Sequence, residues 1–361
     1  MSPILKSAEA VGQEMVSLKS RPYQISPVDF YTTVDKTKAA FSKIINADDP
    51  GRVAIIPSVS YGIANVTNNI DLQPGEEILM PYEQFPSNYY SWKRLADTNG
   101  GVIKSIKSPA AKKKTALWNE AILEAITTQT KVVAISNTHW ADGTIFDLEK
   151  IGARCREVGA YLIIDGTQSI GALPFDQKKV QADAIICAGY KWLLGPYSIG
   201  VAYYGPKFDT GIPIEENWIN RHESENFQNL VNYQDNYKPK AARYSVGEQS
   251  NFILIPMQLQ AFEQILDWGV HNIQNYCKEL TKDALNELQS LGVDLEDGEN
   301  RAHHLFGMYL NDRFDLQKLK EILAENKVFV SFRGNAIRVA PHVYNHQKDL
   351  EALVNCFKKL R

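Results

Sequence analysis

The segment that decides the fold runs from Tyr161 to Gly200 and reads YLIIDGTQSIGALPFDQKKVQADAIICAGYKWLLGPYSIG. It opens with a short apolar run that ends in Asp165, and a second apolar run, residues 184–188, leads through a glycine to Lys191. Continuous apolar runs of this length are typical of buried parallel strands. The first run is therefore predicted to deliver its carboxylate to the carboxyl edge of a sheet, with the lysine following about one βαβ span later.

The pairing of Asp165 with Lys191 indicates a chemical site. Each alone has an ordinary explanation, because strand-ending aspartates occur in Rossmann, P-loop and phosphatase-like folds and most lysines are solvated. A lysine flanked by apolar residues is different, since burying an ammonium group is costly unless its pKa falls or a partner neutralises it. An amine of lowered pKa is also a good Schiff-base nucleophile. Together the two residues suit pyridoxal phosphate, which needs an acid at its pyridine nitrogen and a lysine at its aldehyde.

Two motifs in this segment, DGTQSIG at 165–171 and GYKWLLGP at 189–196, resemble the cofactor core of the class V aminotransferase family. The specific elements are Asp-x-x-Gln and Lys-x-x-x-Gly-Pro, and fainter similarity covers most of the chain. The resemblance implies pyridoxal 5'-phosphate as the cofactor, with Lys191 and Asp165 as the catalytic residues. It also implies that Gln168 forms a hydrogen bond with the ring oxygen.

The same resemblance implies an α/β chain of fold type I, the fold of a large class of pyridoxal-phosphate-dependent transferases. We expect a large domain, residues 49–250, with a mostly parallel sheet of seven-stranded type between helices. Residues 251–361 are predicted to form a small C-terminal α+β domain, because two long helices are followed there by mixed strands and helices, with strands at 328–331 and 336–339. Residues 1–48 are predicted to be a helical arm packed on the small domain.

Further cofactor contacts are expected where another strand ends. The apolar run at 53–57 leads into small hydroxylated residues and a helix start, which points backbone amides at a phosphate. On the resemblance, the backbone of Val59 and the side chain of Ser60 bind the phosphate, and Tyr190 is a further ligand. Phe85 is expected to stack on the pyridine ring as a flat apolar lid. Without the resemblance, these residues would be an ordinary N-cap serine region and a core phenylalanine.

The substrate side of the site is expected at two polar stretches. The strand at 130–136 ends at Asn137, which on the resemblance reaches the cofactor oxygen or the substrate carboxylate, and Trp140 is expected to line the substrate side. His139 is either a general base or a hydrogen-bonded structural histidine. Arg338 resembles the family arginine that clamps the substrate α-carboxylate bidentately. Taken alone, Arg338 predicts a salt bridge at a strand end.

Composition excludes several classes of function. The 361 residues are 44% hydrophobic and carry a formal net charge of -3, which gives no electrostatic case for nucleic acid or an anionic membrane. The basic run at 112–114 is expected to be a solvated loop. No apolar stretch approaches the ~20 residues of a membrane span, and the N-terminus lacks the apolar core of a signal peptide. Four widely spaced cysteines predict neither a disulfide framework nor a metal site, so a cytoplasmic location is the default.

The sequence therefore predicts a pyridoxal-phosphate-dependent enzyme acting on an amino acid, with an aminotransferase as the leading assignment. The alternatives are a lyase or epimerase of the kynureninase or isopenicillin-epimerase type, a cysteine desulfurase, or a catalytically silent binding protein. A desulfurase is disfavoured because no cysteine lies on a loop before Arg338. The resemblance also implies a homodimer with active sites at the interface. Glu248 stands where relatives have a threonine that reaches the partner's phosphate, so this contact would pass to a neighbour such as Gln249 or Ser250.

Overall fold

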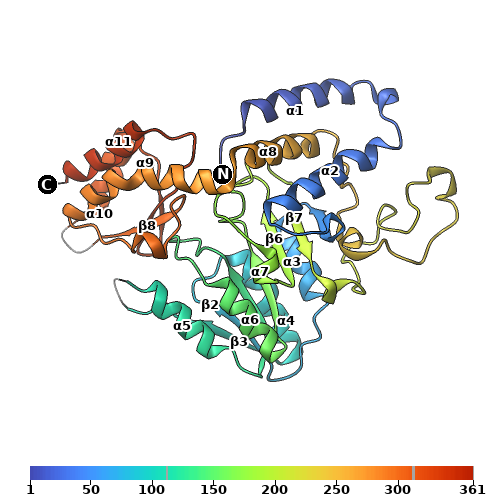
Figure 1. Ribbon diagram of the computed structural model, residues 1–361, viewed down its shortest axis with the longest axis horizontal. Helices are drawn as coiled ribbons and strands as arrows, with labels where there is room; N and C mark the ends of the chain where they lie inside the picture. Colours follow the sequence, from blue (N-terminus) through green and yellow to red (C-terminus); the bar gives the residue numbers. More distant parts are fainter. Residues whose placement is uncertain (111–112, 311–313, 361) are drawn as a thin grey trace.

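The computed structural model describes residues 1–110, 113–310 and 314–360, and it is built around one seven-stranded sheet (Figure 1). The strand order is β1-β7-β6-β5-β4-β2-β3, with neighbours parallel from β6 to β3 and β7 antiparallel to both β1 and β6. The strands are β1 (Val53–Ile56), β2 (Glu77–Pro81), β3 (Val102–Ile106), β4 (Thr130–Ser136), β5 (Tyr161–Asp165), β6 (Ala184–Ala188) and β7 (Gly200–Tyr204). The predicted fold, a mostly parallel sheet of fold type I, is confirmed.

Helices cover both faces of this sheet, as a parallel sheet requires because helices form its crossover connections. On one face lie α3 (Val59–Thr67) and α4 (Tyr90–Asn99). On the other lie α5 (Thr115–Ala125), α6 (Leu148–Val158), the short α7 (Gln177–Val180) and α8 (Leu254–Trp268). Strands β1, β6 and β7 are buried along their whole length, which explains their continuous apolar sequences. None of the described helices is long and apolar enough to cross a membrane.

A smaller antiparallel sheet, in the order β8-β10-β9, organises the C-terminal part of the chain. It comprises β8 (Phe306–Tyr309), β9 (Ser331–Arg333) and β10 (Ala336–Val339), and it shares a separate hydrophobic cluster with α9 (Val270–Ser290), α10 (Leu316–Glu325) and α11 (Gln347–Lys358). Strand β9 begins at Ser331 rather than at the predicted residue 328. The amide of Val328 donates to the carbonyl of Leu323 at the end of α10, so it is not available to the sheet. Pairing with β10 starts only at Ser331.

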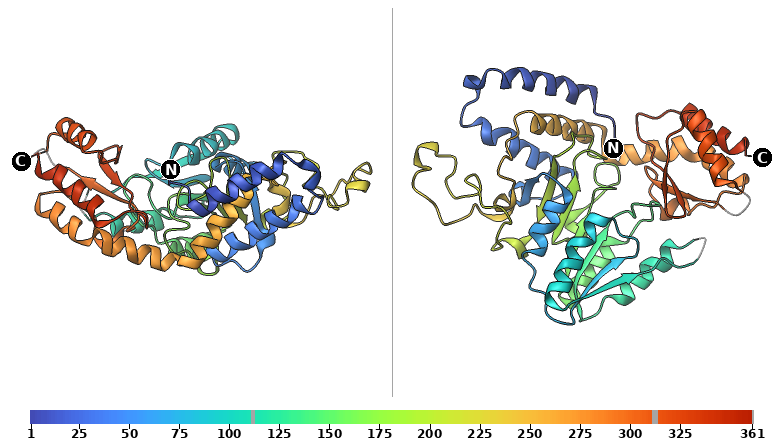
Figure 2. Two further views of the ribbon diagram at one scale, coloured as in Figure 1. Left: turned by 90° about the horizontal axis from the view of Figure 1, so that it is seen from above. Right: turned by 180° about the vertical axis from the view of Figure 1, so that it is seen from behind.

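The N-terminal arm consists of α1 (Lys6–Lys19) and α2 (Asp29–Ile44), which lie along α8 (Figures 1 and 2). Helix α2 also contacts β1, and Phe41 packs with Phe262 of α8 in the core of the large sheet. The arm therefore does not lie on the three-stranded sheet, because the helix that it covers belongs by packing to the large sheet. The division of the chain at residues 48 and 250 stays a prediction, and this packing favours counting α8 with the large domain.

Residues 209–247 form a long irregular segment. Its only regular elements are the 3-10 turns Phe227–Asn229 and Lys240–Tyr244. The segment projects to one side of the large sheet, far from the C-terminal part of the chain (Figure 1). Long irregular segments are uncommon in compact domains and usually serve a function.

Candidate active site

A cavity of about 280 Å³ lies at the carboxyl edge of the large sheet, where β5 ends at Asp165 and β6 is followed by Lys191. Open α/β sheets bind their ligands at this edge. Six residues expected from the sequence line the cavity: Val59, Ser60, Phe85, Asp165, Tyr190 and Lys191. The fold therefore gathers side chains from separate strand ends into one site.

The N-terminus of α3 forms one wall of this cavity. Ser58 caps the helix: its Oγ accepts a hydrogen bond from the amide of Tyr61 at 3.2 Å and lies 2.9 Å from Ser60 Oγ. The first amides of a helix, here including that of Val59, have no partner within the helix, and the helix dipole adds positive potential. A phosphate at this wall would accept hydrogen bonds from the free helix amides and from the serine hydroxyls.

Tyr197 and Ser198 also line the cavity and were missed by sequence reasoning. The Tyr197 ring lies 4.5 Å from the Tyr190 ring, and Ser198 has a φ of 68°, so the chain turns sharply here. The only signal in the sequence is their place directly after the Gly-Pro of the lysine motif.

Asp165 is 7% exposed and held by the turn that follows β5. Its Oδ1 accepts a hydrogen bond from the amide of Thr167 at 3.0 Å, and Thr167 Oγ1 accepts one from the amide of Ala188 at 3.2 Å. Burial raises the pKa of the Asp165 carboxyl, while the hydrogen bonds of Thr167 and the charge of Lys191 act in the opposite direction. A poorly solvated carboxylate of this kind strongly stabilises a cationic nitrogen placed beside it.

A tight turn around Lys191 fixes its backbone. The amide of Leu194 donates to the Lys191 carbonyl at 3.0 Å, and the amide of Gly195 donates to the Gly189 carbonyl at 2.9 Å. A Cβ at Gly189 would lie 2.6 Å from the carbonyl oxygen of Ile199, and a Cβ at Gly195 would lie 1.9 Å from Oε1 of Gln258 on α8, so a side chain at either position would displace a neighbour. Helix α8 thus packs directly beneath Lys191.

The side chain of Lys191 is half-buried, and its Nζ lies 5.4 Å from the ring centroid of Phe85. Burial lowers the pKa of the Lys191 ammonium; the charge of Asp165 opposes this effect, and the charges of Arg338 and Arg333 add to it. Because the neutral amine is the nucleophile, this environment favours attack on an aldehyde.

Gln168 is not among the residues that line the cavity, although its neighbour Thr167 is, and it accepts hydrogen bonds from two side chains. The indole Nε1 of Trp192 donates to Gln168 Oε1 at 3.2 Å, and His304 Nε2 donates to the Gln168 carbonyl at 2.8 Å. Burial lowers the pKa of His304 to about 3, so its ring is neutral, and its Nδ1 accepts from Gln274 Nε2 at 2.7 Å. Since an indole can only donate, the amide oxygen of Gln168 faces Trp192 and its NH₂ group remains as a donor. His304, which precedes β8, was missed because its role depends on a contact between distant segments.

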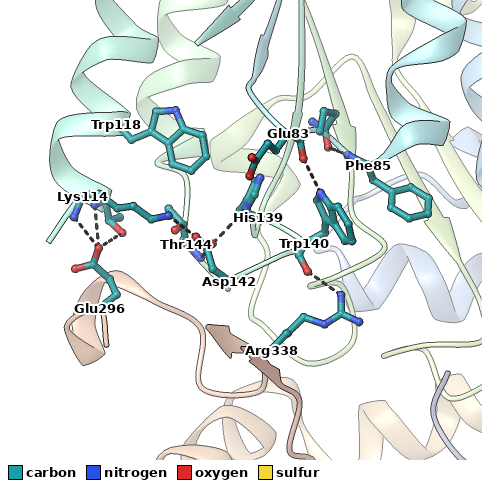
Figure 3. Close-up of polar contacts among 12 residues, drawn as sticks. Glu83, Phe85, Lys114, Trp118, His139, Trp140, Asp142, Thr144, Glu296 and Arg338 are labelled. Carbon is teal, nitrogen blue, oxygen red and sulfur yellow. Dashed lines mark hydrogen bonds and ion pairs between the residues drawn. The ribbon is translucent and has the colours of Figure 1, made fainter. Parts of the chain in front are cut away.

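Trp140 and Arg338 meet at the rim of the site (Figure 3). The Trp140 ring lies edge-on to Phe85, with 5.5 Å between ring centroids, and its Nε1 donates to the carbonyl of Glu83 at 2.7 Å. Arg338 points at this turn and donates from Nη1 to the Trp140 carbonyl at 2.7 Å. Burial, together with the charge of Arg333, lowers the pKa of Arg338 to about 10.

Asn137 is placed differently from the other predicted residues. It follows β4 but lines a second cavity, of about 530 Å³, bounded mainly by α5, α6 and their neighbours. Its carbonyl accepts from the amide of Phe146 at 3.1 Å, because the chain folds back through a bridge between Thr138 and Ile145. The structure does not bring Asn137 into the cavity that contains Lys191.

The comparisons with known proteins decide the family. The aminotransferase class-V family model matches residues 11–353. The chain belongs to the aminotransferase class-V family. An uncharacterised aminotransferase of Bacillus subtilis is 24% identical over 89% of this chain and 83% of its own length. A probable cysteine desulfurase of Pyrococcus abyssi is 23% identical over 90% of this chain and 82% of its own length. Among solved structures, a cystine C-S lyase aligns with a TM-score of 0.86 at 17% identity, over 99% of this chain and 95% of that one.

The residues present fit pyridoxal 5'-phosphate, the cofactor of this class V family. The helix terminus at Ser60 suits the phosphate, the buried carboxyl of Asp165 suits the pyridine nitrogen, and Phe85 lies where a ring can stack. Lys191 completes the donor set as the amine of lowered pKa. The family assignment confirms the cofactor that the sequence predicts.

His139 belongs to a buried polar cluster that links the loop after β4 in the large sheet to the C-terminal sheet (Figure 3). Its Nδ1 lies 3.3 Å from Oδ1 of Asp142, whose Oδ2 accepts hydrogen bonds from Lys114 and from Tyr309, the latter at 2.6 Å. Burial alone would raise the pKa of Asp142, but His139 and Lys114 outweigh it and hold this pKa well below its usual range. His139 is 2% exposed and packs 5.1 Å from the Trp118 ring, so its position favours a structural role over that of a general base.

This cluster corrects one expectation for the basic run at 112–114. Lys114 is an internal ion-pair partner of Asp142, with only 14% of its side chain exposed, and not a solvated loop residue. Lys113 is exposed and pairs with Asp297, while residue 112 lies outside the described part of the chain. The sequence could not separate these lysines, because the carboxylate that selects Lys114 lies on another loop.

Proposed function

We propose that this protein is an aminotransferase that uses pyridoxal phosphate to act on an amino acid, with Lys191 as its reactive lysine. The observation that carries the proposal is the placement of Lys191 and Asp165 on one cavity, with Arg338 at its rim. The intact set argues against a catalytically silent binding protein, because a half-buried lysine and a buried carboxyl cost stability unless they are used.

The residues take distinct parts in this mechanism. The cofactor, when bound, supplies an electron sink for the bonds at the substrate Cα. Asp165 holds a proton on the pyridine nitrogen, because a buried carboxylate favours a neighbouring cation. Lys191 removes the proton at the substrate Cα as a general base and then delivers it away from Cα as a general acid, because a proton returned to Cα would only regenerate the amino acid. Arg338 binds the α-carboxylate, and Phe85 with Trp140 excludes water from one side of the site.

A panel of amino acids offered to the cofactor-loaded enzyme tests this proposal, with keto acid, ammonia, sulfide and enantiomer composition assayed separately. An aminotransferase forms a keto acid only when a second keto acid accepts the amino group, and it releases no ammonia. A lyase would release ammonia or sulfide, a desulfurase would release sulfur only from cysteine-like substrates, and an epimerase would change only the configuration. Substrate turnover without amino-group transfer would contradict the proposal.

Replacement of all four cysteines by alanine is expected to leave most of the turnover intact. Cys155, Cys187, Cys277 and Cys356 are all buried, and burial raises the pKa of each thiol, that of Cys155 and of Cys277 to about 12. A sulfur acceptor must be a thiolate that reaches the substrate, and none of the four lines the cavity of Lys191. The measurement is kcat/KM per folded protein. Loss of activity on cysteine from a single replacement, with a persulfide at that position in the wild type, would identify a desulfurase instead.

We further propose that the chain acts as a homodimer. Several large apolar side chains of the irregular segment 209–247 are exposed: Ile212, Ile214, Trp218, Leu230, Val231 and Tyr233. Exposed apolar groups that gather on one segment favour a protein interface. Gln249 and Ser250 are the candidates for the contact with the partner's phosphate. Gln249 is buried, and Ser250 Oγ donates to the Phe30 carbonyl at 2.8 Å. Light scattering should give twice the chain mass of 40.7 kDa. A cytoplasmic location stays a prediction.

A further inference from the structure

A second arginine, Arg333, stands beside Arg338 on the hairpin of β9 and β10. Arg333 is paired with Ala336, and Ser331 is paired with Arg338. Paired residues share a side of the sheet, and alternate residues of a strand do so as well. Arg333 and Arg338 are therefore diagonal neighbours on one face, held at that spacing by the two-residue turn at 334–335.

Both guanidinium groups lie at the Trp140 turn. The Cζ of Arg333 is 5.6 Å from the centroid of the Trp140 ring, and Arg338 donates to the Trp140 carbonyl at 2.7 Å. Next to burial, the charge of Arg333 is a further cause of the lowered pKa of both Arg338 and Lys191. Three cationic groups thus act on one another across a single site.

The positive charge is not compensated by the hydrogen bonds that these groups make. In the described parts of the chain, Arg333 donates to its neighbour's carbonyl at Phe332 and Arg338 to that of Trp140, so both use neutral acceptors. The Nε of Arg338 is buried without a hydrogen-bond partner there. The carboxylate of Glu83 stands near the hairpin turn, 4.0 Å from the point that a Cβ on Gly334 would occupy. Like charges held together cost free energy, which an anionic ligand would offset.

We propose that Arg333 binds an anionic group on the substrate side chain, so that the enzyme acts on amino acids of the aspartate or glutamate type. Arg338 takes the α-carboxylate and Arg333 takes the second anion, a carboxylate or a group of similar charge such as a sulfinate. A substrate with a neutral side chain leaves the charge of Arg333 uncompensated. This inference rests on the proposed function, in which Arg338 binds the α-carboxylate.

The kinetic test compares aspartate with asparagine and glutamate with glutamine, pairs that differ in charge but hardly in shape. The readout is the ratio of kcat/KM for the acid to kcat/KM for its amide. In Arg333→Gln this ratio is expected to fall by roughly 10- to 100-fold, the value of a charge-assisted hydrogen bond. Arg154→Gln, which removes a partly exposed arginine of α6 paired with Glu157, is the matched control and should leave the ratio unchanged. A ratio unchanged in Arg333→Gln, or a wild type that prefers the amides, overturns the proposal.

A binding measurement separates this inference from the proposed reaction. Succinate and glutarate carry two carboxylates but no amine, and they are titrated against the cofactor-loaded enzyme by absorbance and by calorimetry, with butyrate as the singly charged control. Arg333→Gln is expected to weaken the dicarboxylates by about 10-fold or more and butyrate much less. Absence of turnover on every amino acid would defeat the proposed function, yet this titration would still decide the role of Arg333. Dicarboxylate affinity that does not depend on Arg333 refutes that role, and circular dichroism confirms that the variant is folded.

Discussion

Replacing Lys191 by alanine is expected to lower kcat/KM by at least about 10³-fold on every substrate. In the proposed function Lys191 both anchors the cofactor and carries the proton at the substrate Cα, and alanine can do neither. Among the described residues that line the cavity, Lys191 is the single lysine, so no neighbouring amine can take its place. Steady-state kinetics of the purified variant, with cofactor content measured by absorbance, give the loss.

The same assignment predicts where the cofactor becomes attached. Loaded wild-type protein should be yellow, and borohydride should fix the cofactor to Nζ of Lys191, which peptide mass mapping locates. Lys38 is a matched control, because it is 8% exposed and burial lowers its pKa to about 8, although it lies on α2 and not on the cavity. A label on Lys38 or on any other lysine, or no label in loaded protein, would refute the assignment.

The second large effect is expected for Asp165→Asn, which should lower kcat/KM by roughly 10²-fold or more. Asparagine keeps the shape of the side chain but removes the charge that stabilises a protonated pyridine nitrogen. Because burial already raises the pKa of the Asp165 carboxyl, its replacement by a neutral amide should not destabilise the fold. The thermal midpoint of the variant checks this directly, alongside its kinetics.

Asp183→Asn is the matched control for this experiment. Asp183 is also largely buried, and burial raises its pKa, but it precedes β6 at the opposite end of the strand, where it accepts from the amide of Leu162 at 2.8 Å. Its replacement should leave kcat/KM close to that of the wild type. Near wild-type turnover in Asp165→Asn would show that Asp165 is only a strand-end acid.

Much of the fold and the centre of the site could be predicted because they depend on short, local sequence patterns. Buried strands such as β5 and β6 have continuous apolar sequences; β5 ends in Asp165, and Lys191 is the third residue after the end of β6. The glycines at 189 and 195 mark a turn where an added side chain would press on Ile199 or Gln258. These features depend on residues that are close in the sequence, so they can be recognised without the structure.

Other parts of the site depend on contacts between distant segments and could not be predicted. Gln168 is held by a hydrogen bond from His304, a residue more than a hundred positions away in the sequence. Arg333 joins Arg338 only through the register of a hairpin, and a shift of one residue would turn it to the other face. The sequence also does not show that the arm lies along α8, since the pattern of an amphipathic helix does not identify the element it packs on.

The turn between β9 and β10 has a consequence for redesign. It closes with Gly334 and Asn335 alone, and Gly334 adopts a φ of 52°, a conformation that glycine accepts readily. Tips of this kind accommodate inserted residues better than strands do. A longer connection carrying a thiol, grafted here, would begin beside Arg333, whose Cζ lies 5.6 Å from the centroid of the Trp140 ring, while the sheet, Lys191 and Asp165 stayed as they are. The reaction of this fold could therefore be altered by changing one short loop, without changing the residues at the centre of the site.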